Sequence, residues 1–515
     1  MSAVTRNNAR TLFVVLGNQL YPPALLSAHH AGRIFMAEDI GLCTYVRHHK
    51  QKIALFLAAM RAYRDDLVAR GHIVHYEQLD PSRPDDDYES RLARCVRAHD
   101  IDHLMCWEIE DKFFETRVQA FAQRHRLRLT LLSSPMFLTS RAEFADWLAS
   151  HRPHMATFYQ WQRRRLDVLM ERNGRPSGGR WSFDQDNRLA LPRTQSIPPA
   201  PRARPDRHVL DVIPLILEHF AGHPGELSAE AWWLPTTRRQ ALSWLRSFLR
   251  ERFDLFGPFE DALSRRGPVL FHSVLSPVLN LGLLTPREVL DHALTHAGQH
   301  RVRISSLEGF VRQIIGWREF VRGIYRHYSD RQESSNFFGH TRRLRPCWYE
   351  ATTGLPPLDD VIRKALRYGW THHIERLMVA SNLMTLCEIE PRAACRWFME
   401  MYVDSSDWVM GPNVFGMGLF SDGGIFATKP YVCGSNYLLR MGDDAKPPAA
   451  PRSGSADSWR DVMDGLYWRF VHRQRAFFRG QARMAQMVGT LDRIHPARRR
   501  RLFQAAENFI AATTR

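Results

Sequence analysis

Short apolar runs alternate with helical patterns over residues 1–135 of the chain. The segment 52–71 has the spacing of an amphipathic helix, and Gly71 is a typical stop signal at its end. Strands that alternate with helices predict an α/β domain built on a doubly wound parallel sheet. The runs predicted to form strands are 12–17, 33–38, 73–79, 103–108 and 127–133.

Ligands of such sheets bind beyond the carboxyl ends of the strands, which points to the loops after Gly17 and Glu38. No G-x-G-x-x-G sequence follows the first strand. A dinucleotide-phosphate loop is therefore not predicted in this domain.

Helical periodicity prevails from residue 216 to residue 515, which predicts an all-α domain. Examples are 238–253 and 305–328, and in the second Ser305 and Glu308 fit a capping box. The intervening segment 136–215 contains a basic helical pattern (158–175) and a proline-rich run, so we predict an interdomain linker there. Residues 445–458 are of low complexity and predict a loop.

The chain has 515 residues with a net charge of +17. This charge favours a polyanionic partner, because basic side chains that neutralise phosphates release counterions. The alternative is a generally basic enzyme without a nucleic-acid partner. No apolar run reaches the ~18 residues that span a membrane, and the N-terminal apolar run is too short for a signal peptide. We therefore expect a cytoplasmic protein, without membrane contact and monomeric.

Seven cysteines are spread over the chain, and no CxxC or CxxH pair occurs. The sequence therefore predicts neither a zinc site nor a redox dithiol. The odd number and the expected compartment favour free thiols.

Chemistry-bearing residues gather in the second half. The motif HSVLSPVLNLGLLTP (272–286) interleaves small hydroxyls with apolar residues, and hydroxyls at a helix start suit a phosphate. The alternative is that Ser276 and Thr285 are ordinary N-caps, each followed by proline.

In THHIERLM (371–378) two adjacent histidines would point about 100° apart on a helix. Histidine is the natural proton donor near neutral pH, although most helix histidines are surface or core residues.

The run DSSDWVMGPNVFGM (404–417) supplies carboxylates and a carboxamide, and TKPYVCGSNY (428–437) follows with two tyrosines. Without context, the first of these is an Asx-rich helix–loop junction. The two runs and the histidine pair suit a deep pocket for a flat aromatic ligand. Together with 272–286 they closely resemble the prokaryotic photolyase-related group of the cryptochrome/photolyase family, and most of all its bacterial (6-4) photolyases.

The resemblance implies an α/β antenna domain followed by an all-helical domain that binds FAD. The residues it assigns to FAD are Ser273, Leu275, Ser276, Gln313, Trp317, Arg318, Asp404, Asp407 and Asn413.

The resemblance also implies light-driven repair of pyrimidine (6-4) photoproducts in damaged DNA. His373 would donate a proton to the lesion, with His372 as its neighbour. Tyr431, Tyr437 and Asp184 would line the catalytic pocket, where Asp184 matches the family pattern better than Asp186. Leu377 and Met417 would contact the substrate. Trp397 would relay electrons, with Trp348 or Tyr349 as the outer member of the relay.

Two further cofactors are common in this group. Residues 38–53 resemble the entrance of an antenna pocket that holds a ribityl-lumazine in relatives. Many relatives carry a four-thiolate iron–sulfur cluster. Here residues 441–470 contain no cysteine, and the ligand position before the histidine pair falls near Pro357. We therefore expect no cluster and no other metal.

Three alternatives remain open. A cryptochrome-type photoreceptor would keep the fold and the flavin, but would need no proton donor beside a lesion. A photolyase for cyclobutane dimers is disfavoured by the histidine pair. A non-catalytic binder of single strands would use basic grooves and aromatic rings, but would need no phosphate-binding motif.

Overall fold

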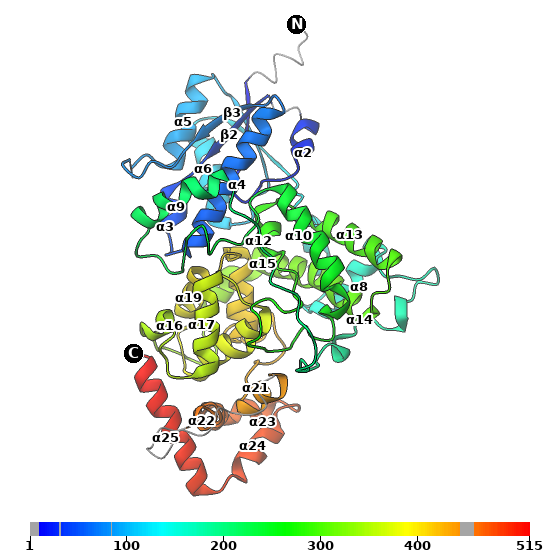
Figure 1. Ribbon diagram of the computed structural model, residues 1–515, viewed down its shortest axis with the longest axis vertical. Helices are drawn as coiled ribbons and strands as arrows, with labels where there is room; N and C mark the ends of the chain where they lie inside the picture. The colour runs from blue at the N-terminus through cyan, green and yellow to red at the C-terminus, as the bar shows by residue number, and fades with distance from the viewer. Residues whose placement is uncertain (1–9, 30–31, 84, 443–457) are drawn as a thin grey trace.

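A computed structural model describes residues 10–29, 32–83, 85–442 and 458–515. The predicted loop 445–458 therefore falls outside the described residues, apart from Ser458. The molecule is elongated, with the α/β domain at one end and the helices that precede the C-terminus at the other (Figure 1).

All five predicted strands are present and parallel, in the order β3-β2-β1-β4-β5. The prediction of a doubly wound parallel sheet is confirmed. β1 is buried at every position, as expected for a central parallel strand covered on both faces. The strands are Thr11–Val14 (β1), Arg33–Ala37 (β2), Ile73–Glu77 (β3), His103–Trp107 (β4) and Arg128–Leu132 (β5).

The longest helix of the first domain, Lys50–Ala69 (α4), is the one that the sequence predicted. Gly71 follows it at φ +85°, a conformation that glycine adopts without strain. A later helix, Arg207–His219 (α9), packs along α4 (Figure 1). The other helices of the domain are Pro23–Ala28 (α2), Ile40–Thr44 (α3), Tyr88–Ala98 (α5) and Lys112–Arg124 (α6).

Residues 136–215 are more structured than a simple linker. They contain Arg141–Ser150 (α7) and Met155–Leu166 (α8), which pack against the helical domain. The prediction of a helix over 158–175 is wrong at its C-terminal end. Asp167 adopts the left-handed conformation at φ 51°, and Arg163 turns inward to donate to the carbonyl of Trp181 at 3.1 Å.

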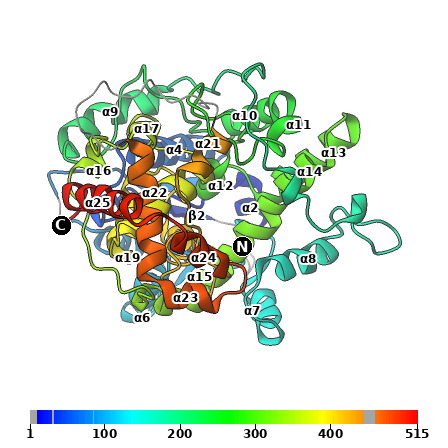
Figure 2. The same cartoon turned by 90° about the horizontal axis from the view of Figure 1, so that it is seen from below.

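The second domain is helical, as predicted, and its last four helices pack together at the C-terminal end (Figure 2). Its α-helices are Arg238–Glu251 (α10), Phe253–Phe256 (α11), Ser276–Leu281 (α12), Pro286–Gln299 (α13), Ile304–Val311 (α14), Glu319–Ser334 (α15), Cys347–Glu350 (α16), Pro356–Tyr368 (α17), Asn382–Leu386 (α18), Pro391–Met401 (α19), Asp407–Gly411 (α20), Ser435–Met441 (α21), Trp459–Arg473 (α22), Arg475–Gly480 (α23), Ala485–Asp492 (α24) and Pro496–Thr513 (α25). Three π-helical segments interrupt or extend them: Arg312–Arg318 (η3), Glu375–Ser381 (η4) and Pro412–Gly418 (η5).

The predicted capping box at Ser305 and Glu308 is not formed. The helix begins one residue earlier, at Ile304, and no side chain caps it. The Glu308 carboxylate is buried and accepts a hydrogen bond from the backbone N–H of Phe183 at 2.9 Å. The carboxylate is therefore committed to a distant segment that the local pattern does not show.

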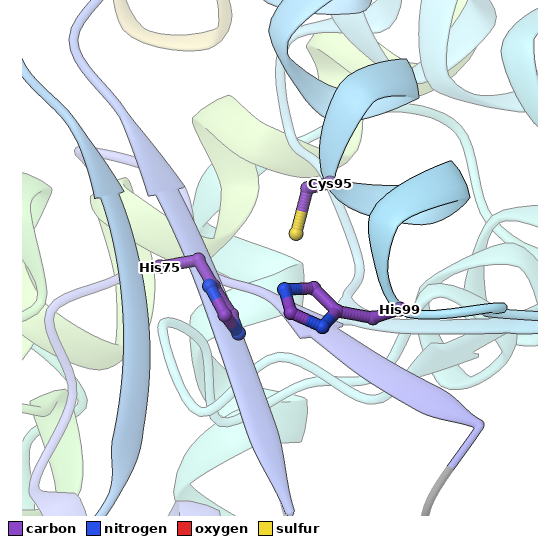
Figure 3. Close-up of side chains that lie close together, drawn as sticks. All are labelled: His75, Cys95 and His99. Carbon is purple, nitrogen blue, oxygen red and sulfur yellow. The ribbon is translucent and has the colours of Figure 1, made fainter.

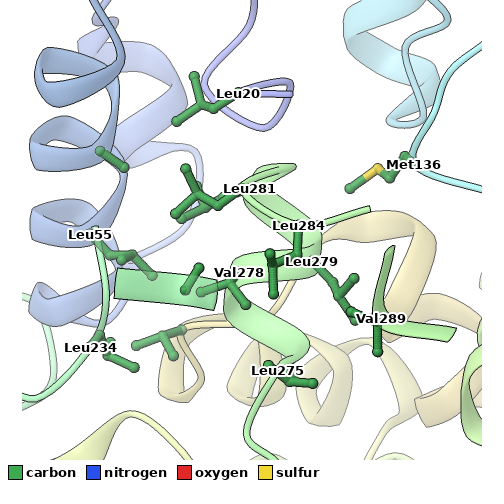
Figure 4. Packing of buried hydrophobic residues seen from close by; sticks show 14 of the residues in the cluster. Leu20, Leu55, Met136, Leu234, Leu275, Val278, Leu279, Leu281, Leu284 and Val289 are labelled. Carbon is green, nitrogen blue, oxygen red and sulfur yellow. The ribbon is translucent and has the colours of Figure 1, made fainter. Parts of the chain in front are cut away.

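Helix α12, which carries part of the 272–286 motif, is wedged between the two domains (Figure 4). Its apolar side chains belong to the same buried cluster as Leu20 and Leu55 of the first domain. The backbone N–H of Leu20 donates to the carbonyl of Leu281 at 2.8 Å. Gly282 ends the helix at φ +84°, where a Cβ would lie 2.7 Å from the ring of Tyr21. The motif is thus held by both domains.

Candidate functional site

The three π-helical segments carry a large share of the predicted site residues. Segment η3 contains Gln313, Trp317 and Arg318, segment η4 contains Leu377, and segment η5 contains Asn413 and Met417. π-Helical turns are rare and occur frequently at functional sites, because the wider turn redirects side chains.

Asp404 joins two of the predicted motifs. Its carboxylate is buried, accepts a hydrogen bond from the Ser276 hydroxyl at 2.6 Å, and pairs with both Nη atoms of Arg376 at 2.9 and 3.1 Å. The Asn280 amide donates to the Asp404 carbonyl at 2.9 Å. We call Ser276, Asn280, Arg376 and Asp404 the Asp404 network. It brings the phosphate motif and the 404–417 run into direct contact.

The N-cap alternative for the two hydroxyls is half correct. Thr285 caps α13 and forms a capping box with Glu288. Ser276 does not cap α12, because its hydroxyl is committed to Asp404.

The backbone of the phosphate motif is strained immediately before α12. Val274 adopts φ +51°, which is unusual for a β-branched residue. Such conformations cost about 1–3 kcal/mol and cluster at functional sites. On either side, the Ser273 carbonyl accepts from Trp244 Nε1 at 2.9 Å, and Leu275 is buried.

The residues predicted on η3 diverge. Gln313 donates to the buried carboxylate of Glu260 at 2.6 Å, whereas Trp317 packs against the Phe426 ring. Arg318 points toward the segment that follows the first domain, where its guanidinium lies 4.5 Å from the ring of Phe137. Burial lowers the pKa of Arg318 to about 10. The three side chains therefore do not share one environment.

The two adjacent histidines have opposite environments. His373 is half-exposed, with 48% of its side chain accessible, and its Nε2 lies 3.3 Å from Asp261 Oδ1. Burial acts to lower the pKa of His373, but the hydrogen bond and charge of Asp261 raise it overall. His372 is buried and stacks on His272 with ring centroids 4.8 Å apart. Burial lowers the pKa of His372 well below its usual value. His373 is thus the better proton carrier.

The charge of Asp261, the partner of His373, also acts on two tyrosines from a distant segment, Tyr431 and Tyr437. Tyr431, Tyr437 and Leu377 pack against one small apolar cluster formed by Ile374, Met378 and Cys433. Burial and the negative charges of Asp184 and Asp261 raise the pKa of Tyr431. We call Asp184, Asp261, His373, Tyr431 and Tyr437 the histidine–tyrosine cluster.

Asp184 and Asp186 point to different partners. Asp184 lies 3.3 Å from Nη1 of buried Arg312 and also pairs with Arg188. Asp186 pairs instead with Arg180 at 2.6 Å. This placement favours Asp184 over Asp186 as the acidic residue near His373.

Sequence reasoning missed several residues of the site. Arg312 is buried and lies between the carboxylates of Asp184, Glu308 and Glu260. Burial raises the pKa of Glu260 to about 7. His272 is the first residue of the phosphate motif, so its position in the sequence could have identified it as a site residue. Nothing in the local sequence distinguishes Glu260 from other acidic residues.

Three predicted residues lie apart from the Asp404 network. The Asp407 carboxylate accepts from the Tyr45 hydroxyl at 3.2 Å and so faces the first domain. The Asn413 amide donates to the carbonyl of Val409 at 2.8 Å, within its own helix. Met417 packs against the main apolar cluster.

Trp397 and Trp348 are both fully buried and lie in contact. Trp397 Nε1 donates to the Trp348 carbonyl at 2.9 Å. The ring of Tyr402 meets Trp397 edge to face at 5.9 Å, and Arg376 of the Asp404 network lies 4.0 Å from the Tyr402 ring. Aromatic rings therefore lead from the Asp404 network through Tyr402 to Trp397, and Trp397 reaches Trp348 through the Trp348 backbone carbonyl.

A cavity of about 130 Å³ opens at the carboxyl ends of the strands. The loops after Gly17 and Glu38 line it, as predicted, and residues of the helical domain close it. Burial lowers the pKa of Lys52 to about 8 and raises that of Asp111 to about 7. The polar lining residues include Asn18, Glu38, Asp39, Tyr45, His48, Lys52, Asp111, Asn280, Ser405 and Ser406.

A second cavity, of about 140 Å³, lies beside Pro357. Its described wall offers no thiol, but carries the charged groups of Lys364 and Glu375, whose Nζ and Oε1 lie 2.5 Å apart. All seven cysteines are free thiols.

Several buried polar atoms at the histidines have no hydrogen-bond partner in the protein. They are Nε2 of His272 and both ring nitrogens of His372. Leaving such an atom unpaired costs about 1–3 kcal/mol. This arrangement fits a site that a polar ligand such as FAD completes.

Among the described residues, no helix is long and apolar enough to span a bilayer.

Comparisons with known proteins identify the relatives of this chain. Residues 13–232 match the family model described as deoxyribodipyrimidine photo-lyase-related protein, and residues 310–432 match the FAD binding domain of DNA photolyase. A (6-4) photolyase of Agrobacterium fabrum is 33% identical over 489 residues, which covers 94% of this chain and 96% of that protein.

Two solved structures share the fold. A bacterial class III photolyase from Agrobacterium tumefaciens superposes with a TM-score of 0.56 at 17% identity, covering 97% of each chain. An archaeal photolyase from Sulfolobus tokodaii gives 0.55 at 16% identity, covering 84% of this chain and 88% of that one. The predicted order of an α/β domain followed by a helical domain is confirmed.

Proposed function

The chain belongs to the cryptochrome/photolyase family, and on that premise we propose that it is a light-driven flavoenzyme that reverses pyrimidine (6-4) photoproducts in DNA. One observation carries the choice of lesion. His373 is accessible, its pKa is raised by the hydrogen bond and charge of Asp261, and the next residue, Ile374, belongs to the apolar cluster that Tyr431 and Tyr437 contact. A photoreceptor that only signals has no need of a proton donor at this place.

FAD is the cofactor that the second domain would hold. Ser273, Leu275 and Ser276 lie on the strained turn that leads into α12, and Asp404 reaches the same turn through Ser276. Gln313, Trp317, Arg318, Asp407 and Asn413 complete the proposed set. When bound in its reduced form, FAD supplies one electron on excitation by light.

The chain's own contribution to the reaction is the handling of a proton. In the proposed mechanism His373 donates its proton to the hydroxyl group that is transferred within the lesion. Asp261 favours the protonated ring before the transfer, because the carboxylate accepts from Nε2. In this proposal Tyr431, Tyr437, Asp184, Leu377 and Met417 would contact the lesion, and Leu377 packs on the same apolar cluster as the two tyrosines. His372 supports its neighbour by packing, since its own ring is buried and neutral.

Recovery of an oxidised flavin would use the buried tryptophans. Trp397 and Trp348 lie in contact, and the Tyr402 ring links Trp397 to Arg376. We propose this series as the electron relay.

Damaged DNA is the proposed partner. The lesion would leave the duplex to reach His373, at a cost of a few kcal/mol that is smallest at a damaged site. The net charge of +17 supports contacts to phosphates. Helix α8 contributes little to such contacts, because Arg163 is buried and Arg165 is paired with Glu143. The exposed tract 497–501 at the start of α25 is the better candidate.

The cavity at the strand ends is the proposed site of an antenna such as a ribityl-lumazine, because residues 38–53 line much of it. We propose that the protein holds no iron–sulfur cluster, since residues 441–470 contain no cysteine. A cytoplasmic monomer completes the proposal.

The test compares wild type, His373→Ala and His300→Ala, the last a control at the exposed C-terminal end of α13. Each protein is loaded with FAD, bound to an oligonucleotide with one (6-4) photoproduct, and illuminated. His373→Ala should keep FAD, photoreduction and lesion binding, yet lose repair by about 10²–10⁴-fold, the usual contribution of a general acid. His300→Ala should repair normally.

Full repair by His373→Ala would remove the proton-donor role. A wild type that repairs only cyclobutane dimers would be a photolyase of that other class. A wild type that binds FAD, yet repairs neither lesion, would point to a photoreceptor.

A further inference from the structure

Three metal-binding side chains meet in the first domain, away from every residue assigned above. His75 lies on β3, Cys95 lies on α5, and His99 caps the C-terminal end of α5. One ligand atom from each lies within 4.8 Å of the others. The Cys95 sulfur points toward the two imidazoles (Figure 3).

The fold places these side chains together for simple geometric reasons. Cys95 and His99 are four residues apart, so they share one face of α5. Strand β3 lies at the edge of the sheet, and α5 packs over β2 beside it. His75 is thereby brought to the helix from twenty positions earlier in the chain.

The three side chains are at least half-buried, and their polar atoms have little competition from other partners. Cys95 is buried and free, and both histidines are half-buried with ring centroids 4.2 Å apart. Among the described residues, the polar side-chain contact of these three is that between His75 Nε2 and Arg33 Nη1, at 3.5 Å. That distance is at the long limit of a hydrogen bond, so little is lost when it breaks.

We propose that His75, Cys95 and His99 bind a zinc ion, with water in the fourth position. Zinc takes thiolate sulfur at about 2.3 Å and imidazole nitrogen at about 2.0–2.1 Å, and three protein ligands with one open position are common. Tetrahedral ligand atoms then stand about 3.3–3.7 Å apart. The three side chains must therefore close by about 1 Å, which rotation of two half-buried imidazoles supplies.

The charges around the site are mixed. Glu77 projects from the same face of β3 as His75, and its carboxylate supplies negative charge near Cys95. Arg33 opposes a cation and has to turn away from His75 when the metal enters. The bound ion would fasten the edge strand to α5. None of the three ligands belongs to an element that carries a proposed flavin or lesion residue, so the site does not depend on the proposed function.

The test uses the full-length flavoprotein, stripped with a chelator and titrated with zinc. Bound metal is measured by elemental analysis and by competition with a chromogenic chelator, and unfolding temperature is followed in parallel. A second titration with Co²⁺ reports sulfur coordination through its thiolate charge-transfer absorption.

Wild type should bind one zinc per chain, unfold at a higher temperature when zinc is present, and show the cobalt–thiolate band. Cys95→Ser should lose that band, and Cys95→Ser, His75→Ala and His99→Ala should each weaken zinc binding by more than about 100-fold, since even outer partners of a ligand are worth 10–100-fold. His125→Ala, at the equivalent end of α6, should bind like wild type. The FAD content of each variant checks its folding.

Binding of less than stoichiometric zinc by wild type would overturn the proposal. Unchanged affinity in all three ligand variants would do the same, because the ion would then sit elsewhere. If Cys95→Ser does not fold, the two histidine variants still decide the question.

Discussion

Asp261 is expected to set the pH range over which His373 carries a proton. The perturbation is Asp261→Asn, which removes the charge and keeps the size of the side chain. The wild-type Nε2 and Oδ1 atoms are 3.3 Å apart, and 48% of the histidine side chain is accessible to solvent.

The size of the effect follows from Coulomb's law. At 3.3 Å two unit charges attract by about 1.3 kcal/mol in water and by about 5 kcal/mol at an effective dielectric constant near 20. Because nearly half of His373 is exposed, solvent screening keeps the coupling near the lower figure. Removal of this attraction disfavours the imidazolium, so the pKa of His373 should fall in the variant.

The sign is fixed by the direction of the shift. Asp261 raises the pKa of His373, so the protonated ring and the repair that depends on it are present below that pKa and lost as pH rises through it. In Asp261→Asn the loss should begin at a lower pH.

The assay is the pH profile of light-driven (6-4) repair at saturating lesion, with FAD content checked at each pH. The control is Asp186→Asn, whose carboxylate pairs with Arg180 rather than with the histidine. An alkaline limb that stays in place, or that moves equally in both variants, would refute the coupling.

Three further predictions concern the rest of the site. Asp404→Ala should lower FAD content and destabilise the fold by about 3–5 kcal/mol, because it leaves the mostly buried Arg376 without its carboxylate partner. Denaturant unfolding measures the stability, the flavin-to-protein absorbance ratio measures the FAD content, and an unchanged ratio would contradict the prediction. Trp397→Phe should slow photoreduction while repair by pre-reduced enzyme stays normal, as flavin spectra under blue light would show; an unchanged photoreduction rate would exclude the residue from the relay. Replacing Arg498 and Arg500 with Ala should flatten the plot of log affinity for DNA against log salt by about 1.8, or 0.9 for each lost phosphate contact; an unaltered slope would mean that the tract is only a solvated helix end.

The strands and the order of the domains could be predicted from the sequence, because buried parallel strands read as short continuous apolar runs. The end of α8 could not. It depends on Arg163 turning inward to carbonyls and on the left-handed Asp167, neither of which alters the local pattern. Glu308 likewise has the spacing of a capping residue, but a backbone amide 125 residues earlier takes its carboxylate.

The site could be predicted as a set of motifs, but not as a set of contacts. Nothing near Ser276 shows that Asp404 will accept its hydroxyl. The pKa of His372 is lowered by burial and the pKa of His373 is raised by Asp261, and both effects come from other segments of the chain. The same holds for the proposed zinc site, because its third side chain, His75, comes from a strand twenty residues before Cys95 and forms no closely spaced motif with it.

The π-helical segments have a consequence for changes in chain length. A π-helical turn closes its hydrogen bond over one residue more than an α-helical turn. Deleting one residue inside η3 would let α14 and α15 join as one regular helix. The side chains of α14 and of α15 would still point in the directions they have now. The same holds where η5 continues α20. The fold would therefore tolerate a one-residue deletion at these places, while Gln313, Arg318 or Asn413 would be carried out of position. We expect insertions and deletions within this family to be harmless in many surface loops, yet to abolish flavin binding in the middle of these apparently ordinary helices.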